Sequence, residues 1–284
     1  MNNKLTIVIP TFNEEKNLKR LYNVFKKNFN INVYDNFSTD DTRELALSFG
    51  WKVKQFKNKG YAEDPDLVKL YLKDTSTDWI YICRADEVPS KKLVKLLDNI
   101  EKFNFDAIQV SRKSLLNGKR CNAWGDDYET PIFNKNYFIV KGNNTRIGYP
   151  GIFKSTTRIK RFSKSEGIYI KHFQEFSISG LIQTLNRYSS LMLDGYLTEK
   201  KIPKTPEENF IVHNIRKTRR LFYNNTFLIF ISLFITPPMR FLWHFFYKRG
   251  FTTGVNGFLV SYLMSIEEAL ISAKSLAKKE NWPD

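Results

Sequence analysis

Acidic side chains follow two apolar, strand-like runs of this sequence at the points where the runs end. Asp35 closes the run 31–35, and Asp86 and Glu87 come directly after the run 79–83. In an open α/β sheet, ligands bind outside the carboxyl ends of the parallel strands, so we expect both acidic residues of the second run to face a bound molecule. Mg²⁺ and Mn²⁺ take carboxylate oxygens and substrate phosphates as ligands. The pattern is typical of a site for a nucleotide diphosphate and a divalent cation, and a solvated acidic turn is the alternative.

Strands and helices alternate from the start of the sequence to residue 111. Near-continuous apolar runs predict strands, and apolar residues repeating every three or four positions predict helices. The expected strands are residues 4–11, 31–35, 51–56, 79–83 and 105–111. The helices between them are expected to start at an N-cap Asn13, at a capping box from Ser38 to Asp41, at Pro65 and at Ser90. This order predicts an α/β fold with a mainly parallel, doubly wound sheet.

The chain changes character beyond residue 112. Between residues 115 and 161 the periodicity weakens and Gly, Asn and Pro cluster, so we expect a loop-rich part. Helical spacing resumes over residues 177–197, and Pro203 and Pro206 then interrupt the chain. We therefore predict one domain over residues 1–208 and a basic, aromatic-rich helical region over residues 209–284.

Residues 209–266 contain no acidic residue, and their Lys and Arg side chains are interleaved with Phe, Leu, Ile, Trp and Tyr. The apolar stretch 227–235 is shorter than the roughly 20 residues of a membrane-spanning helix, and Pro237 and Pro238 are expected to end it. Basic residues beside an aromatic-rich amphipathic segment favour an anionic membrane surface. We expect residues 209–250 to bind such a surface. A hairpin packed on the main domain, or a contact within a homo-oligomer, is the alternative.

The overall charge narrows the classes of partner. The 284 residues include 45 Lys and Arg against 29 Asp and Glu, a formal net charge of +16, which attracts polyanions. A basic nucleic-acid-binding protein is one interpretation, but no nucleic-acid-binding module is recognised, and we expect no nucleic-acid partner. The sequence also contains neither the Gly-x-Gly-x-x-Gly nor the P-loop fingerprint. Dinucleotide-dependent and ATP-hydrolysing classes therefore lose their main support.

Two cysteines, Cys83 and Cys121, argue against a disulfide framework and fit a reducing compartment. The first residues pass directly into an expected strand, without the pattern of a signal peptide. We therefore expect a cytoplasmic protein that lies on the inner face of the cytoplasmic membrane.

Three ordered motifs carry a resemblance to a known family. Ile-Val-Ile-Pro-Thr-Phe-Asn-Glu-Glu (7–15), Tyr-Asp-Asn-Phe-Ser-Thr-Asp-Asp-Thr (34–42) and Asp-Trp-Ile-Tyr-Ile-Cys-Arg-Ala-Asp-Glu (78–87) resemble the family 2 glycosyltransferases of GT-A fold. Weaker similarity to bacterial lipopolysaccharide-core and surface-polysaccharide sugar transferases continues beyond them. The resemblance implies an inverting transfer from a nucleotide diphosphate sugar, expected to be a UDP-sugar, to a saccharide or lipid-linked acceptor. It also implies a nucleotide-sugar-binding half over residues 1–112 and an acceptor-binding half over residues 113–208.

Carried over residue by residue, the resemblance implies a donor site at the strand ends. Its expected residues are Pro10, Thr11, Glu14, Asp35, Asn36, Arg84, Ala85 and Asp86. Asp35 is expected on the nucleobase and Asp86 on a divalent cation, Mn²⁺ or Mg²⁺. His172 is expected to complete the metal or phosphate shell, and a histidine without function is the alternative.

The sequence departs from the family at Arg84, which replaces the first Asp of the usual Asp-x-Asp. Its guanidinium can pair with the diphosphate, or form an ion pair with Asp86 or Glu87, so dependence on a metal stays open. An inverting transfer also needs a general base. The candidates are Asp127, then Asp126, then Glu175, and a plain surface acid is the alternative for each. A catalytically inactive protein of the same fold is the remaining alternative.

Overall fold

The computed structural model of the chain describes residues 2–26, 28–57, 65–124, 126–140, 151–174, 177–198, 222–223 and 225–282. The chain divides into two compact units. The first comprises Met1–Lys113, Asp127–Gly142 and Pro150–Phe173, and the second comprises Ser114–Asp126, Asn143–Tyr149 and Gln174–Asp284.

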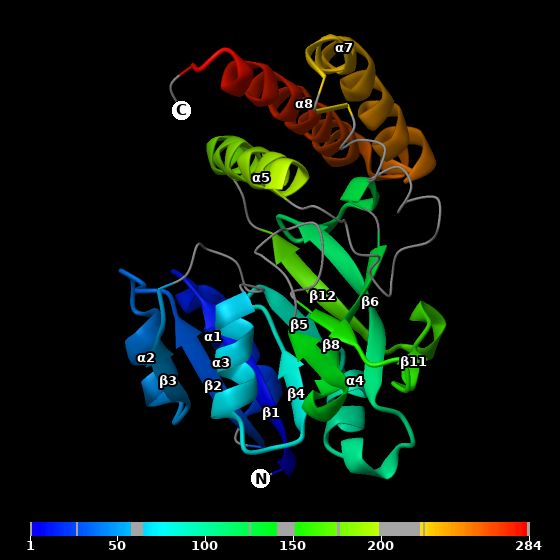
Figure 1. The fold of residues 1–284 in the computed structure, drawn as a ribbon. Coiled ribbons are helices and arrows are strands. Elements are labelled where there is room, and N and C mark those ends of the chain that lie inside the picture. The colour runs from blue at the N-terminus through cyan, green and yellow to red at the C-terminus, as the bar shows by residue number, and fades with distance from the viewer. Residues whose placement is uncertain are drawn as a thin grey trace. The chain divides into compact units, whose positions relative to one another are not determined.

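The first unit is built on four parallel strands in the order β3-β2-β1-β4 (Figure 1). These strands are β1 (Asn2–Thr11), β2 (Phe29–Asp35), β3 (Lys52–Gln55) and β4 (Trp79–Ile82). The helices that accompany them are α1 (Glu15–Phe25), α2 (Thr42–Ser48), α3 (Pro65–Asp74) and α4 (Lys91–Leu97). The expected α/β class is confirmed, and these four strands form the expected parallel part of a sheet that is mixed as a whole.

Alternate residues of β1 show why this strand is apolar throughout. Ile7 and Ile9 are fully buried in a cluster with Leu18 of α1, and Val8 is fully buried in a second cluster with Tyr71 of α3. Helices therefore cover both faces of the parallel strands, which removes the polar face that a half-exposed strand would show.

The sheet continues beyond β4 in the order β8-β6-β12-β5, where β8 runs antiparallel to β4 and β12 runs antiparallel to β5. They are β8 (Asp126–Asn134), β6 (Ala107–Leu116), β12 (Tyr169–Gln174) and β5 (Glu87–Pro89). Further short strands are β7 (Lys119–Arg120), β9 (Phe138–Val140), β10 (Gly151–Phe153) and β11 (Ile159–Arg161). The prediction of a loop-rich part over residues 115–161 is therefore wrong for the described residues, because such short strands give too few positions for a periodic signal.

Two expected helix starts are also wrong. Asn13 adopts a left-handed backbone with φ 56°, and its side-chain oxygen accepts a hydrogen bond from Thr39 N at 2.8 Å. Ser38 donates its hydroxyl to Asp35 instead of capping α2. The turn at Asn13 and the turn at Ser38 are hydrogen-bonded to each other, and a local sequence motif does not reveal such a contact. Ser90, by contrast, caps α4 as expected, and its Oγ lies 3.2 Å from the backbone nitrogen of the third helical residue.

The second unit contains α5 (Ile178–Thr198), α7 (Thr226–Leu242) and α8 (Gly254–Lys279), and the expected helix over residues 177–197 is confirmed. α8 contacts both α5 and α7 (Figure 1). Leu185 and Leu263 are buried in one shared cluster, and Tyr196 and Ile271 are buried in another.

The expected break at Pro237 and Pro238 is wrong, because α7 continues through both prolines into a π-helical turn at Trp243–Tyr247. Proline has a φ that suits a helix, and the lost hydrogen bond and the clash of its ring with the preceding turn make a helix costly rather than impossible at that position. The helical segment Thr226–Tyr247 has 22 residues and is long and apolar enough, by length and composition alone, to cross a membrane. The expected membrane-binding residues 209–221 lie outside the described part.

Short 3-10 turns complete the described elements. They are Ile100–Lys102, Asn122–Trp124, Lys135–Tyr137, Lys164–Glu166 and Gly250–Thr253.

Candidate functional site

The carboxyl ends of three parallel strands meet at one edge of the sheet. Thr11 of β1 lies opposite Asp35 of β2, and Val8 of β1 lies opposite Ile82 of β4. β2 and β3 follow on one side of β1 and β4 lies on the other, so the strand order reverses between β1 and β4. Ligands bind at such a reversal in open α/β sheets, which makes the loops after β1 and β4 the candidate site.

The loop after β4 holds Asp86 in a fixed turn. The backbone nitrogen of Glu87 donates to the carbonyl of Arg84 at 2.9 Å, which closes the turn around Asp86. The carbonyl of Asp86 accepts from Phe173 N of β12 at 2.8 Å. Main-chain bonds within the turn and to the neighbouring strand therefore set the position of the Asp86 carboxylate.

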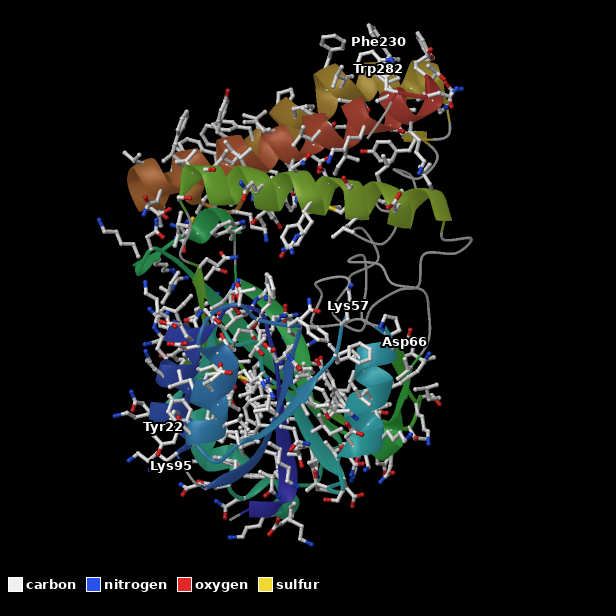
Figure 2. All side chains as sticks on the ribbon, turned by 90° about the vertical axis from the view of Figure 1, so that its left-hand side faces the viewer. Tyr22, Lys57, Asp66, Lys95, Phe230 and Trp282 are labelled. Atoms are coloured by element: carbon white, nitrogen blue, oxygen red, sulfur yellow. The ribbon has the colours of Figure 1, made fainter. Side chains whose placement is uncertain are left out.

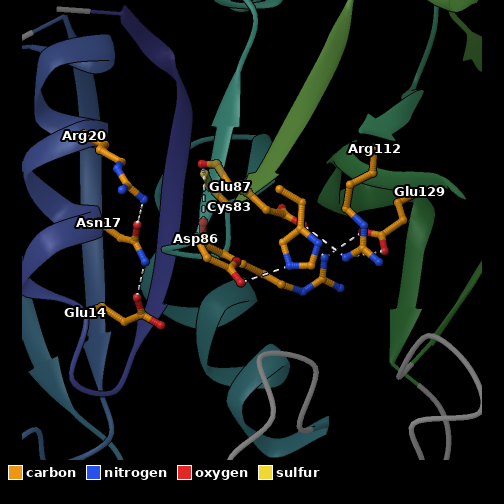
Figure 3. Close-up of polar contacts among 10 residues, drawn as sticks. Glu14, Asn17, Arg20, Cys83, Asp86, Glu87, Arg112 and Glu129 are labelled. Atoms are coloured by element: carbon orange, nitrogen blue, oxygen red, sulfur yellow. Dashed lines mark hydrogen bonds and ion pairs between the residues drawn. The ribbon is translucent and has the colours of Figure 1, made fainter. Parts of the chain in front are cut away.

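Asp86 and His172 form a side-chain pair. The Oδ2 of Asp86 lies 3.0 Å from the Nε2 of His172 on β12 (Figure 3). Burial alone would raise the pKa of Asp86, but the hydrogen bond and charge of His172, with the charges of Arg84 and Arg112, lower it. Asp86 is therefore a carboxylate at neutral pH. The structure brings together the two residues that were expected to hold a metal.

Four charged residues of alternating sign adjoin this pair, and we call them the charge quartet: Arg84, Glu87, Arg112 and Glu129. The Nη1 of Arg84 lies 2.7 Å from both Glu87 Oε1 and Glu129 Oε2. The Nη1 of Arg112 lies 3.3 Å from Glu87 Oε1 and 3.0 Å from Glu129 Oε1. Each carboxylate thus bridges both guanidiniums (Figure 3).

The quartet shows one of the two contacts expected of Arg84 and corrects one expectation for Glu87, while pairing of Arg84 with a diphosphate stays a prediction. The expected ion pair between Arg84 and Glu87 is confirmed. Glu87 is 0% exposed, so the expectation that it faces a bound molecule is wrong. Burial would raise the pKa of Glu129, but the charges of Arg84 and Arg112 outweigh it and lower that pKa to about 2.

Arg112 and Glu129 were missed in the sequence. A charge at the end of a buried run, such as Arg112 on β6, signals a buried partner, because unpaired charges are rarely placed there. Glu129 becomes the partner of Arg112 because β8 lies beside β6 in the sheet. The sequence pattern did not indicate that these two strands are neighbours.

Glu14, in the loop after β1, has a raised pKa, whereas the pKa of Asp86 is lowered. The Oε2 of Glu14 accepts from Asn17 Nδ2 at 2.7 Å, and Asn17 Oδ1 in turn accepts from Arg20 Nη1 at 2.6 Å (Figure 3). Burial, with the negative charges of Asp86 and Asp40, raises the pKa of Glu14 to about 7. Two neighbouring carboxyl groups therefore differ in protonation near neutral pH, an arrangement common at functional sites.

Glu14→Gln is expected to remove a pH dependence of stability. The pKa of Glu14 rises from 4.5 to about 7 on folding, so its contribution is fully present below pH 4.5 and is lost as the pH rises through 7. The amide stays neutral and can still accept from Asn17. Between pH 5 and pH 8, the free energy of unfolding measured with urea should fall by roughly 2 to 3 kcal/mol in the wild type relative to the variant. A difference that does not change with pH would contradict the raised pKa.

Asp35 is fully buried at the end of β2. Its Oδ2 accepts from Ser38 N at 3.1 Å, its Oδ1 accepts from Thr11 Oγ1 at 3.4 Å, and Asn36 N donates to the carbonyl of Thr11 at 2.9 Å. This carboxylate therefore stabilises the turn after β2, and its contact with a nucleobase stays a prediction. The remaining expected donor residues, Pro10 and Ala85, lie at the end of β1 and in the turn around Asp86.

The general base stays a prediction. The backbone of Asp126 and Asp127 opens β8, and Glu175 lies outside the described residues. Among the residues that the structure describes, no group of three or more His, Cys, Asp or Glu side chains is arranged to hold a metal ion. Asp86 and His172 supply two donors, which suits a cation that takes its other ligands from phosphate and water.

The fold is that of the GT-A glycosyltransferases. The mannosyltransferase PcManGT from Pyrobaculum calidifontis has a similar fold, with a TM-score of 0.51 over 97% of this chain and 88% of that chain, at 12% identity. Residues 6–158 match the model of glycosyl transferase family 2, and the chain belongs to this family.

Two curated relatives are named as glycosyltransferases. The SPbeta prophage-derived glycosyltransferase SunS from Bacillus subtilis is 30% identical over 181 residues, which cover 55% of this chain and 42% of SunS. The chain therefore spans less than half the length of that relative. The lipopolysaccharide core biosynthesis glycosyltransferase LpsC from Rhizobium meliloti is 22% identical over 278 residues, covering 95% of this chain and 91% of LpsC.

Proposed function

We propose that this chain transfers a sugar, with inversion, from a nucleotide diphosphate sugar to a saccharide or lipid-linked acceptor. A UDP-sugar is the expected donor. The observation that carries the proposal is the ionised Asp86 beside His172 at the strand-order reversal of a family 2 chain. The alignment with LpsC along nearly the whole chain supports a role in surface-polysaccharide assembly.

Asp86 and His172 would hold a divalent cation, which when bound neutralises charge on a departing diphosphate. The charge quartet supports this choice, because its two guanidiniums are balanced by two carboxylates and offer the diphosphate little net positive charge. PcManGT was solved with GDP-Man and Mn²⁺, which is consistent with a metal-assisted reaction.

Glu14 would act as a hydrogen-bond donor to the nucleotide sugar. With its pKa near 7, a large share of this carboxyl group is protonated at neutral pH, and an O–H can donate to a ribose or phosphate oxygen. The ionised form would repel a diphosphate. Burial of Glu14 beside Asp86 thus favours the protonation state that binds the donor.

The acceptor hydroxyl needs a base within hydrogen-bond reach, and Asp127, Asp126 and Glu175 stay the candidates for this role. We place the reaction in the cytoplasm, on the inner face of the membrane. The two cysteines support a reducing compartment, because both are buried free thiols.

A thermal-shift series with nucleotide sugars, with and without Mn²⁺, tests the proposal. A ligand at 100 times its Kd stabilises the native state by about 2.7 kcal/mol, so a UDP-sugar with Mn²⁺ should raise Tm by roughly 5 to 10 °C. NAD⁺ is the matched control and should leave Tm unchanged, because the dinucleotide fingerprint is absent.

A transfer assay with the donor that binds completes the test. Binding without transfer or donor hydrolysis would indicate the inactive alternative of the same fold. Absence of any shift across UDP-, GDP- and other nucleotide sugars would contradict the proposed donor site.

A further inference from the structure

The outer side of α7 and of the first turns of α8 is apolar and exposed. Most of the exposed large apolar side chains of the described residues lie there, and we call this set the apolar face. On α7 and its π-helical turn it comprises Phe227, Phe230, Phe234, Ile235, Met239, Leu242, Trp243, Phe246 and Tyr247. It continues through Phe251, Val255, Phe258, Leu259 and Tyr262. Figure 2 shows Phe230 on the side of α7 that points away from α5.

The apolar face is one side of an amphipathic pair of helices. Its members on α7 recur every three or four residues, with Phe227 70% exposed and Phe234 65% exposed. The opposite side of α7 packs on α8, where Ile229 is fully buried and the Oγ of Ser232 lies 2.9 Å from the Oγ of Ser272. A continuous exposed apolar surface of this kind marks an interaction site.

The charge around the apolar face is positive. No acidic residue occurs between residues 209 and 266, whereas Lys248 and Arg249 lie between the two helical parts of the face. The first acids of α8, Glu267 and Glu268, are 3% and 1% exposed, and Glu268 Oε1 faces Arg240 Nε at 3.6 Å. The described residues 225–266, which carry the whole apolar face, therefore contain cations and no carboxylate.

We propose that the apolar face docks into the surface of an anionic lipid bilayer, with α7 and the start of α8 lying in the plane of the interface. Aromatic side chains with a polar edge, Trp243, Tyr247 and Tyr262, suit the boundary between water and acyl chains. Anionic headgroups complement Lys248 and Arg249. A second copy of the chain would instead bring two basic, acid-free surfaces together.

The packed side of α7 favours docking over spanning. Ser232 bonds to Ser272 on that side, and α8 buries two carboxylates further along, so only one side of the pair is suited to lipid. The apolar face runs from residue 227 to residue 262. It thus extends the expected membrane-binding region, residues 209–250, into α8.

Vesicle flotation of the full chain, without any nucleotide sugar, tests the proposal. The wild type should float with phosphatidylcholine vesicles containing 30% phosphatidylglycerol and bind pure phosphatidylcholine more weakly. Phe234→Ser with Phe246→Ser should lower the partition coefficient by about 100-fold, because two exposed phenylalanines that would enter the lipid are lost. The matched control, Ile178→Ser with Ile182→Ser, changes two exposed apolar side chains of α5 and should leave binding unchanged.

Two further measurements distinguish a lipid surface from a second copy of the chain as the partner of the apolar face. Lys248→Gln with Arg249→Gln should reduce the preference for anionic over neutral vesicles, and circular dichroism should show that all variants fold. Absence of vesicle binding by the wild type, or equal binding by the phenylalanine variant, would overturn the proposal. So would a lipid-free dimer that the phenylalanine variant converts to a monomer, because the face would then be a subunit contact.

Discussion

Asp86→Asn is expected to lower the rate of sugar transfer by on the order of 10³-fold while the fold stays intact. The amide is nearly the same size and can keep a hydrogen bond to His172, so the turn around residue 86 should persist. It loses the negative charge that His172, Arg84 and Arg112 maintain on this side chain at neutral pH against the effect of burial. Initial rates with the donor found by thermal shift measure the effect.

An Asp-to-Asn change outside the site is the control, because it removes one negative charge without touching Asp86 or His172. Asp66 lies on α3 and pairs with Lys69 at the surface, so Asp66→Asn should keep the wild-type rate. His172→Ala should slow transfer as well, and the double variant should lose less than the sum of the two effects if both side chains hold one cation. Full activity of Asp86→Asn, or of the wild type in excess chelator, would contradict the proposed cation site.

The parallel strands at the start of the chain could be predicted from the sequence because their side chains are buried on both faces of the sheet. β1 is covered on both sides by helices, so Ile7, Val8 and Ile9 are all apolar and the strand is visible as a run. The acidic turn after β4 follows for the same reason, since polarity changes where burial ends. The edge that brings Glu14 and Asp86 together could thus be predicted.

Other parts of the site depend on pairings between distant segments. Asn13 and Ser38 each carry a local helix-start signal, but Asn13 N donates to Ser38 Oγ and Thr39 N donates to Asn13 Oδ1, so these groups join the two turns instead. Glu129 meets Arg84 only because the strand order places β8 beside β4. The sequence left open whether Arg84 pairs with the diphosphate or with Asp86 or Glu87. The motif itself contains Glu87, whereas the second carboxylate beside Arg84, Glu129, comes from β8.

Arg84→Asp should destabilise the fold, although it would restore the family's usual Asp-x-Asp. The new carboxylate would lie beside those of Glu87 and Glu129, with Arg112 as the remaining cation of the quartet. Glu87 is 0% exposed, so water cannot screen this repulsion well. Breaking a buried ion pair costs roughly 3 to 5 kcal/mol, and we expect a loss of that size in the free energy of unfolding measured with urea.

Glu129→Gln should partly rescue the stability of Arg84→Asp while destabilising the wild type. In the wild type it removes a carboxylate that both arginines contact, whereas in the Arg84→Asp background it removes a repelling charge. The double-mutant cycle should therefore give a coupling energy of about 1 to 3 kcal/mol. Glu101→Gln, an exposed change of the same type, should be neutral in both backgrounds.

Arg84→Met distinguishes a structural role from donor binding at the same position. If the guanidinium mainly balances Glu87 and Glu129, the variant should unfold at lower urea while the KM for the nucleotide sugar changes less than threefold at a temperature where it is folded. A large rise in KM with unchanged stability would instead assign Arg84 to the diphosphate. Because Glu87 and Glu129 both pair with Arg84 within the protein, we expect the structural outcome, in which Asp86 and His172 would hold the cation without help from Arg84.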